Sequence, residues 1–314
     1  MRFSIFTSTY NRSEKIDRLI ENIRSQTCTS WELIVVDDGS KDNTVSVVNA
    51  WCHLDDRIKL ISFDQNCGHP VALYNAKICQ VVKGDLVIFM GSDDWFLNDD
   101  CLETIGKSID VKGQEFWKYG FTWLHEHSLE EMPVTKKLSK TTFRSEEIIH
   151  DTYPDSDFLF VYRKKYWAAF DGYFDHPDKF FSSFYDVALN NQFLEQLYDI
   201  PVMIAGWNDD NVTKGKNAEL YFRWSLVHRM YMLSEYGDRM GVNYLSYTMR
   251  SISRSAFLPY SSTDISFALG LKSLRLAFGF GSVALFSLVG ALWPFKKQMV
   301  WVRKKIVERA KQRK

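Results

Sequence analysis

The amino-acid sequence predicts an α/β protein built on a Rossmann-like, doubly wound and mostly parallel sheet. Four runs of β-branched and apolar residues recur at intervals of roughly 25 to 30 residues, the rhythm of strand, helix, strand. These runs are almost continuously apolar, as expected for strands that are covered on both faces. With 314 residues, 46% of them hydrophobic, the chain is long enough to bury at least one full core.

The predicted strands are residues 3–7, 33–36, 58–62 and 86–90. Between the first two, apolar residues follow the i, i+3, i+4, i+7 spacing of an amphipathic helix at Ile16, Leu19, Ile20 and Ile23. Asn11 is the predicted N-cap of this helix, with Glu14 three residues further on.

Two more helices complete the alternation. Asp42 can cap a second helix that carries Val45 and Val48, and Pro70 stands where a first-turn proline belongs in a third helix that runs to Val82. Beyond about residue 110 the aromatic-rich segment 115–127 predicts further strands of a mixed sheet. Helical patterns recur near residues 184–198 and 219–236.

Ligands of doubly wound sheets bind beyond the carboxyl ends of the strands. Polar residues gather at those ends in this sequence. They are Thr9, Tyr10 and Arg12 after the first strand, Asp37 and Asp38 after the second, Asn66 and Gly68 after the third, and Asp93 and Asp94 after the fourth.

The adjacent carboxylates of Asp93 and Asp94 must repel each other unless something offsets their charge. Hard oxygen ligands at a strand end suit Mg²⁺ or Mn²⁺, which take one or two carboxylates together with substrate phosphates. Helix capping or solvated loop charge would also explain the pair. Asp37 and Asp38 can accept from a sugar hydroxyl or a base N–H, although an Asp-Gly turn requires no ligand.

Four motifs in register carry a resemblance to a known family. STYNR (8–12), VVDDGSKDNT (35–44), NCGHPVALYNA (66–76) and KGDLVIFMGSDD (83–94) together resemble the family 2 glycosyltransferases, of the type that acts in bacterial cell-surface polysaccharide synthesis. The resemblance implies a GT-A fold, a nucleotide-sugar donor that is usually UDP-linked, a Mn²⁺ or Mg²⁺ ion, and transfer with inversion at the anomeric carbon.

The resemblance also implies roles for individual residues. Thr9, Tyr10 and Arg12 would line the donor pocket together with Asn66 and Gly68, one or both of Asp37 and Asp38 would hold the uracil, Asp93 would face the ribose and the metal, and Asp94 would coordinate the metal. The sequence departs from the family at Gly91, where many members carry another aspartate.

A second resemblance lies farther along the chain. DGYFD (171–175) and FYDVAL (184–189) are similar to later segments of the family, with Tyr185 in place of the usual acid. Asp186 is therefore the candidate catalytic base that would deprotonate the acceptor hydroxyl. An acidic residue near a helix N-terminus, stabilised by the helix dipole, is the alternative interpretation of Asp186.

Other polar residues have weaker patterns. His125 and His127 alternate on a predicted strand and could form a metal pair, but exposed strand residues also show this spacing. Asp209 and Asp210 follow Trp207 where family members have loops near the acceptor, and a solvated turn explains them equally.

The five cysteines show no CxxC or zinc-like spacing, and no secretory signal precedes the first strand. We therefore expect reduced thiols in a protein that faces the cytosol. They are Cys28, Cys52, Cys67, Cys79 and Cys101.

The C-terminal region combines an apolar segment with a basic tail. Residues 276–295 contain no charged side chain, and a stretch of about 20 such residues can span a bilayer or lie in its plane. From Lys296 onward nine Lys or Arg residues stand against Glu308 alone, so the neutral chain has an acidic body and a basic tail. The tail suits an anionic membrane surface. A buried core helix followed by a soluble basic helix remains an alternative, and the acidic body argues against nucleic acid.

These observations predict three regions: a nucleotide-sugar-binding half (1–110), an acceptor-binding and catalytic-base half (111–235) and a helical membrane-associating region (236–314). The predicted function is transfer of a sugar to a glycan or lipid-linked acceptor at the cytoplasmic side of the membrane, with peripheral attachment or one C-terminal anchor. Two alternatives stay open. One is a nucleotidyltransferase, although residues 7–13 lack the glycine expected of a triphosphate loop, and the other is a catalytically silent, membrane-associated nucleotide-binding protein.

Overall fold

The computed structural model describes residues 2–68, 77–110, 116–126, 138, 140–149, 158–166 and 188–206, and a few positions beyond them (232, 236, 239–241 and 248). The chain divides into two compact units, Met1–Ile148 with Pro154–Asp209 and Ile149–Tyr153 with Asp210–Lys314. The first unit contains the sheet and all the predicted strand ends.

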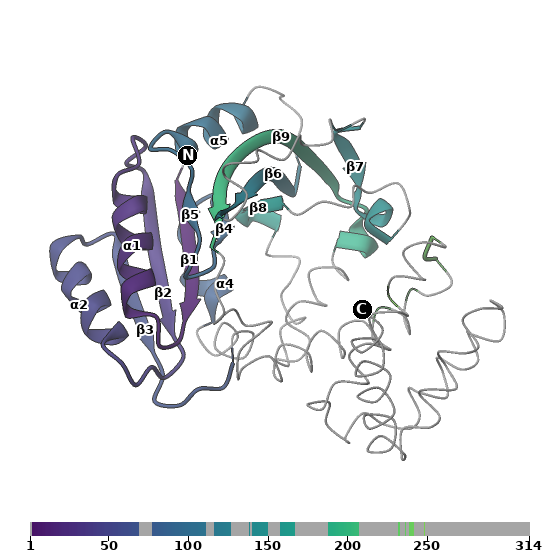
Figure 1. Ribbon diagram of the computed structural model, residues 1–314. Coiled ribbons are helices and arrows are strands. Elements are labelled where there is room, and N and C mark those ends of the chain that lie inside the picture. Colours follow the sequence, from purple (N-terminus) through teal and green to yellow (C-terminus); the bar gives the residue numbers. More distant parts are fainter. Residues whose placement is uncertain are drawn as a thin grey trace, which may run out of the picture. The chain divides into compact units, whose positions relative to one another are not determined.

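The four predicted strands are confirmed and form the parallel half of a nine-stranded sheet (Figure 1). Their spatial order is β3-β2-β1-β4, so the chain starts in the middle and adds strands on both sides. Parallel pairing places their carboxyl ends along a single edge. The strands are β1 (Phe3–Thr9), β2 (Trp31–Asp37), β3 (Ile58–Ser62) and β4 (Leu86–Phe89).

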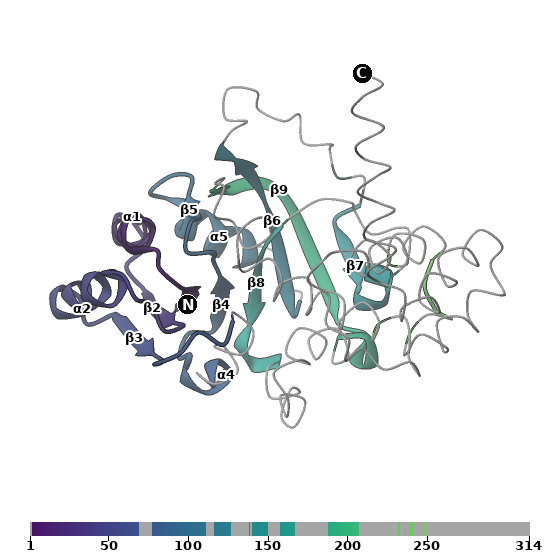
Figure 2. The same cartoon turned by 60° about the horizontal axis from the view of Figure 1, so that its bottom comes forward.

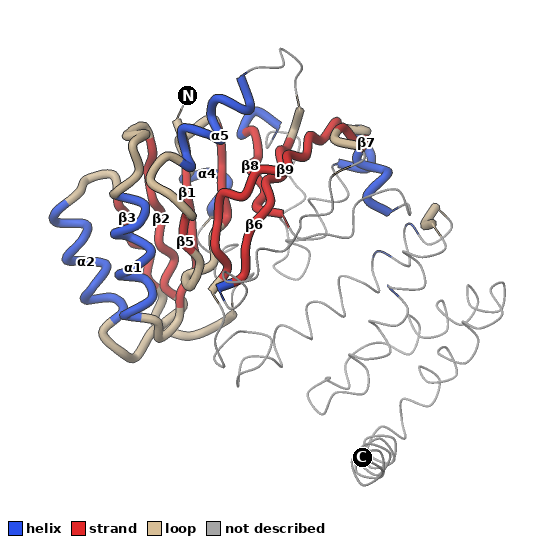
Figure 3. Tube along the Cα trace, turned by 45° about the horizontal axis from the view of Figure 1, so that its top comes forward, coloured by secondary structure: helices blue, strands red, loops and turns tan. Residues whose placement is uncertain are grey.

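The sheet continues beyond β4 as a mixed sheet, as predicted, and the strands follow one another across the molecule in Figure 3. β8 (Phe158–Arg163) is antiparallel to both β4 and β6 (Lys118–His125), and β6 is parallel to β9 (Leu194–Ala205). The short strands β5 (Trp95–Phe96) and β7 (Thr142–Arg144) are antiparallel to β9. A 3-10 turn, η2 (Ser145–Ile149), follows β7.

The prediction of a helix near residues 184–198 is wrong for the second half of that segment. Residues 188–191 are helical, but Leu194 begins β9, in which Glu195 and Gln196 are buried. Pairing with β6 between Glu195 and Ala205, interrupted by two register shifts, outweighs the local helical pattern. The other helix predicted in this half, 219–236, lies outside the described residues except for Met232 and Tyr236, which are helical.

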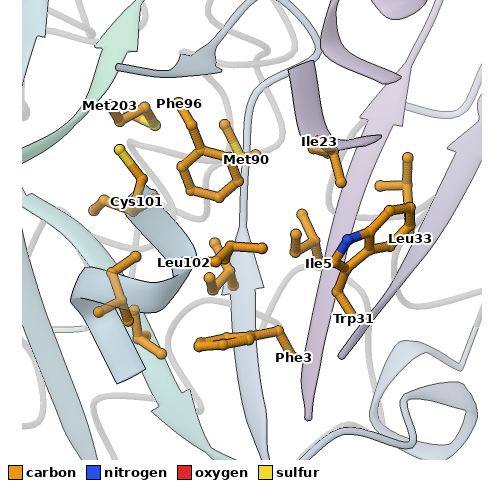
Figure 4. Packing of buried hydrophobic residues seen from close by; sticks show 14 of the residues in the cluster. Phe3, Ile5, Ile23, Trp31, Leu33, Met90, Phe96, Cys101, Leu102 and Met203 are labelled. Atoms are coloured by element: carbon orange, nitrogen blue, oxygen red, sulfur yellow. The ribbon is translucent and has the colours of Figure 1, made fainter. Parts of the chain in front are cut away.

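Helices cover both faces of the parallel half (Figure 2). On one face lie α1 (Ser13–Arg24), α2 (Thr44–Leu54) and α5 (Cys101–Asp110), and the short α4 (Ile78–Val81) lies on the other. The four apolar residues that predicted α1 are all buried in the larger core cluster, and Figure 4 shows one of them, Ile23, with residues of β1 and β2 in that cluster. Strand residues alternate between the two clusters, so the doubly wound arrangement is confirmed.

The helix N-termini differ in detail from the prediction. Asn11 is not the N-cap of α1: its φ of 52° places it in the left-handed region, and Arg12 occupies the cap position instead. Asn43 rather than Asp42 precedes α2, yet Asp42 accepts from the backbone N–H of Thr44 over 2.9 Å. Pro70, at the predicted start of the third helix, lies outside the described residues.

The apolar segment 276–295 and the basic tail also lie outside the described part of the chain. Among the residues that the structure describes, no helix has the length and apolar character needed to cross a bilayer. Four of the cysteines are reduced thiols in the described structure, namely Cys28, Cys52, Cys67 and Cys101.

Candidate functional site

The predicted polar residues lie along the carboxyl edge of the parallel strands. Thr9 at the end of β1 is level with Asp37 at the end of β2, which is level with Ser62 at the end of β3. The backbone N–H of Asp38 donates to the Thr9 carbonyl over 2.9 Å, which extends this alignment past the last strand residues. Tyr10 follows directly and is partly buried.

Asp37 is fully buried and only half of its carboxylate is satisfied. Its Oδ2 accepts from the backbone N–H of Ser40 and from the hydroxyl of Ser62, each over 3.1 Å. Its Oδ1 has no hydrogen-bond partner among the described residues, and neither has the buried hydroxyl of Thr9 on the neighbouring strand. Buried polar atoms are rarely left unpaired, so this edge has hydrogen-bonding capacity for a polar ligand.

Asp38 has a different environment, because both oxygens of its carboxylate accept hydrogen bonds from the loop after β3. Its Oδ1 accepts from the N–H and the thiol of Cys67 over 2.9 and 3.1 Å, and its Oδ2 accepts from the N–H of Gly68 over 2.7 Å. Gly39 permits this close approach, since a Cβ there would lie 2.8 Å from the backbone nitrogen of Asn66. The structure therefore brings four of the predicted donor-site residues together around the end of β2, namely Asp37, Asp38, Asn66 and Gly68.

The turn after β1 is held against the turn after β2. The N–H of Asn11 donates to the hydroxyl of Ser40 over 2.9 Å, and its side-chain oxygen accepts from the N–H of Lys41 over 2.7 Å. The N–H of Arg12 donates to the hydroxyl of Thr44 over 2.9 Å. These contacts explain the unusual backbone of Asn11 and fix the direction in which the Arg12 side chain leaves.

Arg12 crosses the edge to the turn after β4. Its Nη1 lies 2.9 Å from Asp93 Oδ2, and the two side chains are 12% and 18% exposed, so water screens the pair only partly. Arg18, six residues further along the chain on α1, stacks at 3.8 Å over the Trp95 ring and donates to the Asp93 carbonyl over 3.2 Å. It also pairs with Glu126 at 3.8 Å.

Asp94 is oriented by two backbone amides from different parts of the chain. Gly91 N–H donates to its Oδ2 over 3.0 Å, and Gly206 N–H, just past β9, donates to its Oδ1 over 3.2 Å. Burial raises the pKa of Asp94 to about 6, and the neighbouring Asp93 carboxylate adds to the rise. The repulsion between the two aspartates is thus offset on the Asp93 side by Arg12, while the charge of Asp94 is less well compensated.

The two adjacent carboxylates fit a hard divalent cation. Within the described ranges, no three His, Cys, Asp or Glu side chains could enclose an ion by themselves. Mg²⁺ and Mn²⁺ are commonly held by one or two carboxylates together with ligand phosphates. Each Asp94 oxygen accepts one backbone amide and keeps a further lone pair that is available to a cation.

The sequence patterns did not identify Gly206 or Arg18 as part of this edge. A signal for Gly206 does exist in the apolar run 202–205, which ends at a glycine as the fourth strand does at Gly91. For Arg18, its position on the polar side of α1 indicated only solvent exposure.

His125 ends β6 and is partly buried. The remaining candidates lie outside the described residues, namely His127, Asp186, Asp209 and Asp210.

Comparison with known proteins gives a family for the N-terminal half. The model of glycosyl transferase family 2 matches residues 4–166. Glycosyltransferase GlyG of Streptococcus pneumoniae serotype 4 is 29% identical over 109 residues, which are 35% of this chain and 35% of GlyG. Poly(ribitol-phosphate) beta-N-acetylglucosaminyltransferase TarS of Staphylococcus aureus (strain Mu50) is 31% identical over 112 residues, 35% of this chain and 19% of TarS. The matching part thus spans well under two thirds of these relatives.

Solved structures have a similar fold. The crystal structure of S. aureus TarS 1–349 in complex with UDP-GlcNAc has a TM-score of 0.54 and 17% identity, and the likeness covers 100% of this chain and 92% of that one. Mannosyltransferase PcManGT from Pyrobaculum calidifontis, in complex with GDP-Man and Mn²⁺, has a TM-score of 0.53 and 13% identity, covering 96% and 87%. At these identities the likeness shows a common fold.

Proposed function

Because this chain belongs to glycosyl transferase family 2, we propose that it transfers a sugar from a nucleotide-diphosphate donor to a hydroxyl of a glycan or lipid-linked acceptor, with inversion. UDP-linked sugars are the proposed donors. The complex of TarS with UDP-GlcNAc supports this class of donor, whereas the complex of PcManGT with GDP-Man makes guanine nucleotides the alternative to test.

The observation that carries the proposal is the pairing of an unsatisfied buried carboxylate with a carboxylate pair on the same sheet edge. Asp37 Oδ1 and the Thr9 hydroxyl have hydrogen-bonding capacity to spare, so they suit the polar edge of a base or a ribose. Asp93 and Asp94 follow the strand on the other side of β1. Base, ribose and diphosphate can therefore lie along the edge in that order.

At the diphosphate end, Asp94 would hold Mn²⁺ or Mg²⁺, and Asp93 would contact the ribose and the metal region. A bound cation would supply charge stabilisation for the departing diphosphate. The chain itself contributes orientation: Arg12 holds the Asp93 side chain, and Arg18 holds the Asp93 carbonyl. Because these polar groups are already held in place, they need little reorientation as charge develops in the transition state.

The proposed base is Asp186, which rests on the motif FYDVAL (184–189). A carboxylate within hydrogen-bond reach of the acceptor would take its hydroxyl proton as the oxygen attacks the anomeric carbon. The diphosphate leaves from the opposite face, so a single displacement inverts the configuration. This step requires neither a covalent sugar intermediate nor a second base.

The proposed acceptor and location rest on the C-terminal region. The uncharged segment 276–295 and the tail with nine Lys or Arg suit attachment to an anionic membrane surface. We propose that the enzyme works at the cytoplasmic side, by peripheral attachment or one anchor, where a lipid-linked glycan would be within reach.

Release of UDP or GDP from a panel of nucleotide sugars, in the presence of Mn²⁺ and a lipid-linked glycan extract, tests the proposal. Wild type should turn over at least one donor, and both Asp94→Asn and Asp186→Asn should lose most of that activity. Asp56→Asn, in an exposed turn before β3 at the opposite end of the strand, is the matched control and should retain it. Nucleotide binding without any turnover would favour a silent binding protein, and diphosphate release from a nucleoside triphosphate would favour a nucleotidyltransferase.

A further inference from the structure

The two glycines that contact Asp94 have no room for a side chain. A Cβ on Gly91 would lie 2.7 Å from Asp94 Oδ2 and 3.2 Å from Asp93 Oδ1. A Cβ on Gly206 would lie 2.2 Å from the carbonyl oxygen of Asp93 and 3.0 Å from its carbonyl carbon. The same two residues donate their backbone N–H groups to the two oxygens of Asp94. Gly91 thus combines a directed donor with space for the Asp94 carboxylate, and Gly206 combines one with space for the backbone of Asp93.

Gly206 reaches Asp94 because β5 pairs with β9. Trp95 is the partner of Ile204 and Phe96 the partner of Met203, so the antiparallel register brings the end of β9 back along the turn that precedes β5. Phe96 is fully buried and lies in the core with Met90 and Met203 (Figure 4). This packing anchors the strand pair, and the position of Gly206 relative to Asp94 is fixed by it.

We propose that Gly91 and Gly206 form a backbone clamp that orients the Asp94 carboxylate for a divalent cation, so that β9 positions a ligand on the donor side of the sheet. The inference rests on the proposed function, because it assumes that Asp94 binds the cation. Two amides that each hold one oxygen fix the carboxylate plane and leave the outward lone pairs available. Both glycines are positioning residues in this arrangement.

The clamp also gives a reason for glycine at position 91, where the resemblance to the family leads one to expect an acid. The space that a side chain at 91 needs is occupied by the Asp94 carboxylate, so an added aspartate would push Asp94 away from its two donors. Gly91→Asp should therefore weaken cation binding rather than add a ligand. Equal or tighter Mn²⁺ binding by Gly91→Asp would show that the site tolerates a third carboxylate and would overturn this explanation of Gly91.

The test uses the full-length chain and measures Mn²⁺ binding in the presence of UDP, by the loss of the free Mn²⁺ signal in electron paramagnetic resonance. Gly206→Ala and Gly91→Ala should each lower the Mn²⁺ affinity about 10- to 100-fold, the usual effect of removing a group that orients a metal ligand. The affinity for UDP measured with EDTA present should change by less than about threefold, because the base-binding side of the edge is untouched.

Gly106→Ala is the matched control, since a Cβ at this position of α5 would only contact Phe3 at 3.8 Å. It should leave Mn²⁺ binding unchanged. Gly206→Ala meets backbone atoms and can cost stability, so circular dichroism melting accompanies each measurement. Gly91→Ala meets the end of the Asp94 side chain, which can move without unfolding, and this variant decides the question if Gly206→Ala does not fold.

The outcomes distinguish a failure of the proposed metal-dependent function from a failure of the clamp alone. If wild type takes up no Mn²⁺ with UDP or GDP, the proposed metal-dependent function fails and the clamp fails with it. If wild type binds Mn²⁺ and folded Gly91→Ala binds it equally well, the clamp alone is overturned. Weaker Mn²⁺ binding with normal metal-free UDP binding supports it.

Discussion

The Arg12 guanidinium, at the N-cap of α1, lies 2.9 Å from the Asp93 carboxylate in the turn after β4. The pair joins the first and the fourth strand ends across the carboxyl edge of the sheet. It neutralises one of two adjacent acids, and Asp94 beside it is left with two backbone amides. The sheet edge therefore holds one carboxylate whose charge is compensated by an arginine and one whose charge is less compensated, and this difference suits Asp94 as the main metal ligand with Asp93 oriented beside it.

Loss of Arg12 should destabilise the fold. We expect Arg12→Ala to lower the free energy of unfolding by about 1.5–3 kcal/mol, the range for a hydrogen bond to a charged group that is largely removed from water. Urea denaturation measures this change. In the double variant Arg12→Ala with Asp93→Asn, part of the loss should be recovered because the unpaired charge is gone. Strictly additive effects of the two substitutions would contradict a direct coupling.

The open oxygen of Asp37 should be a determinant of nucleotide affinity. In Asp37→Asn one oxygen can still accept from Ser40 and Ser62, while the amide –NH₂ replaces the unsatisfied Oδ1 and can no longer accept from a base. We expect UDP affinity to fall by about tenfold or more, equivalent to at least about 1.4 kcal/mol. Isothermal titration calorimetry without metal measures it, with Asp56→Asn as control. Equal affinity in Asp37→Asn would remove this residue from the binding site.

Glu32 should make stability depend on acid pH. Burial alone would raise its pKa, but hydrogen bonds from Lys59, Ser4 and the Lys83 amide lower the pKa of Glu32 from 4.5 to about 2. The stabilisation is thus complete above about pH 4.5 and is lost as the pH falls toward 2. Glu32→Gln should be less stable than wild type by about 1.5–3 kcal/mol at pH 7.

The difference between the Glu32→Gln variant and wild type should shrink as the pH is lowered from about 4.5 to 2, because wild-type Glu32 becomes protonated over that range. Urea unfolding curves at several pH values measure this convergence. A gap that stays constant between pH 5 and 2.5 would show that the charge of Glu32 does not contribute to folding.

The C-terminal region should control membrane association. A chain that ends at Gly270 should lose its binding to vesicles that contain anionic lipid, whereas the full chain should bind them with a strength that falls as salt is raised. Vesicle sedimentation measures binding, and circular dichroism checks that the shortened chain is folded. Equal partitioning of the two chains would overturn the membrane proposal.

Much of the fold and of the site followed from local patterns in the sequence. The period of Ile16, Leu19, Ile20 and Ile23 determined α1, and nearly continuous apolar runs determined the four parallel strands. Because parallel strands end at one edge, the acids after them could be placed together without coordinates. The start of α1 at Ser13 was less predictable, because contacts from the next turn hold Asn11 in the left-handed region.

Tertiary structure alone decided which atoms meet at that edge. Asp37 and Asp38 are adjacent aspartates. The loop after β3 donates hydrogen bonds to the carboxylate of Asp38 only, and one oxygen of Asp37 has no partner among the described residues. The contact between Asp94 and Gly206 joins positions 112 residues apart and depends on the register of β5 against β9. Local periodicity determines which face of an element is buried, whereas strand order and register depend on the free energy of the whole packed sheet.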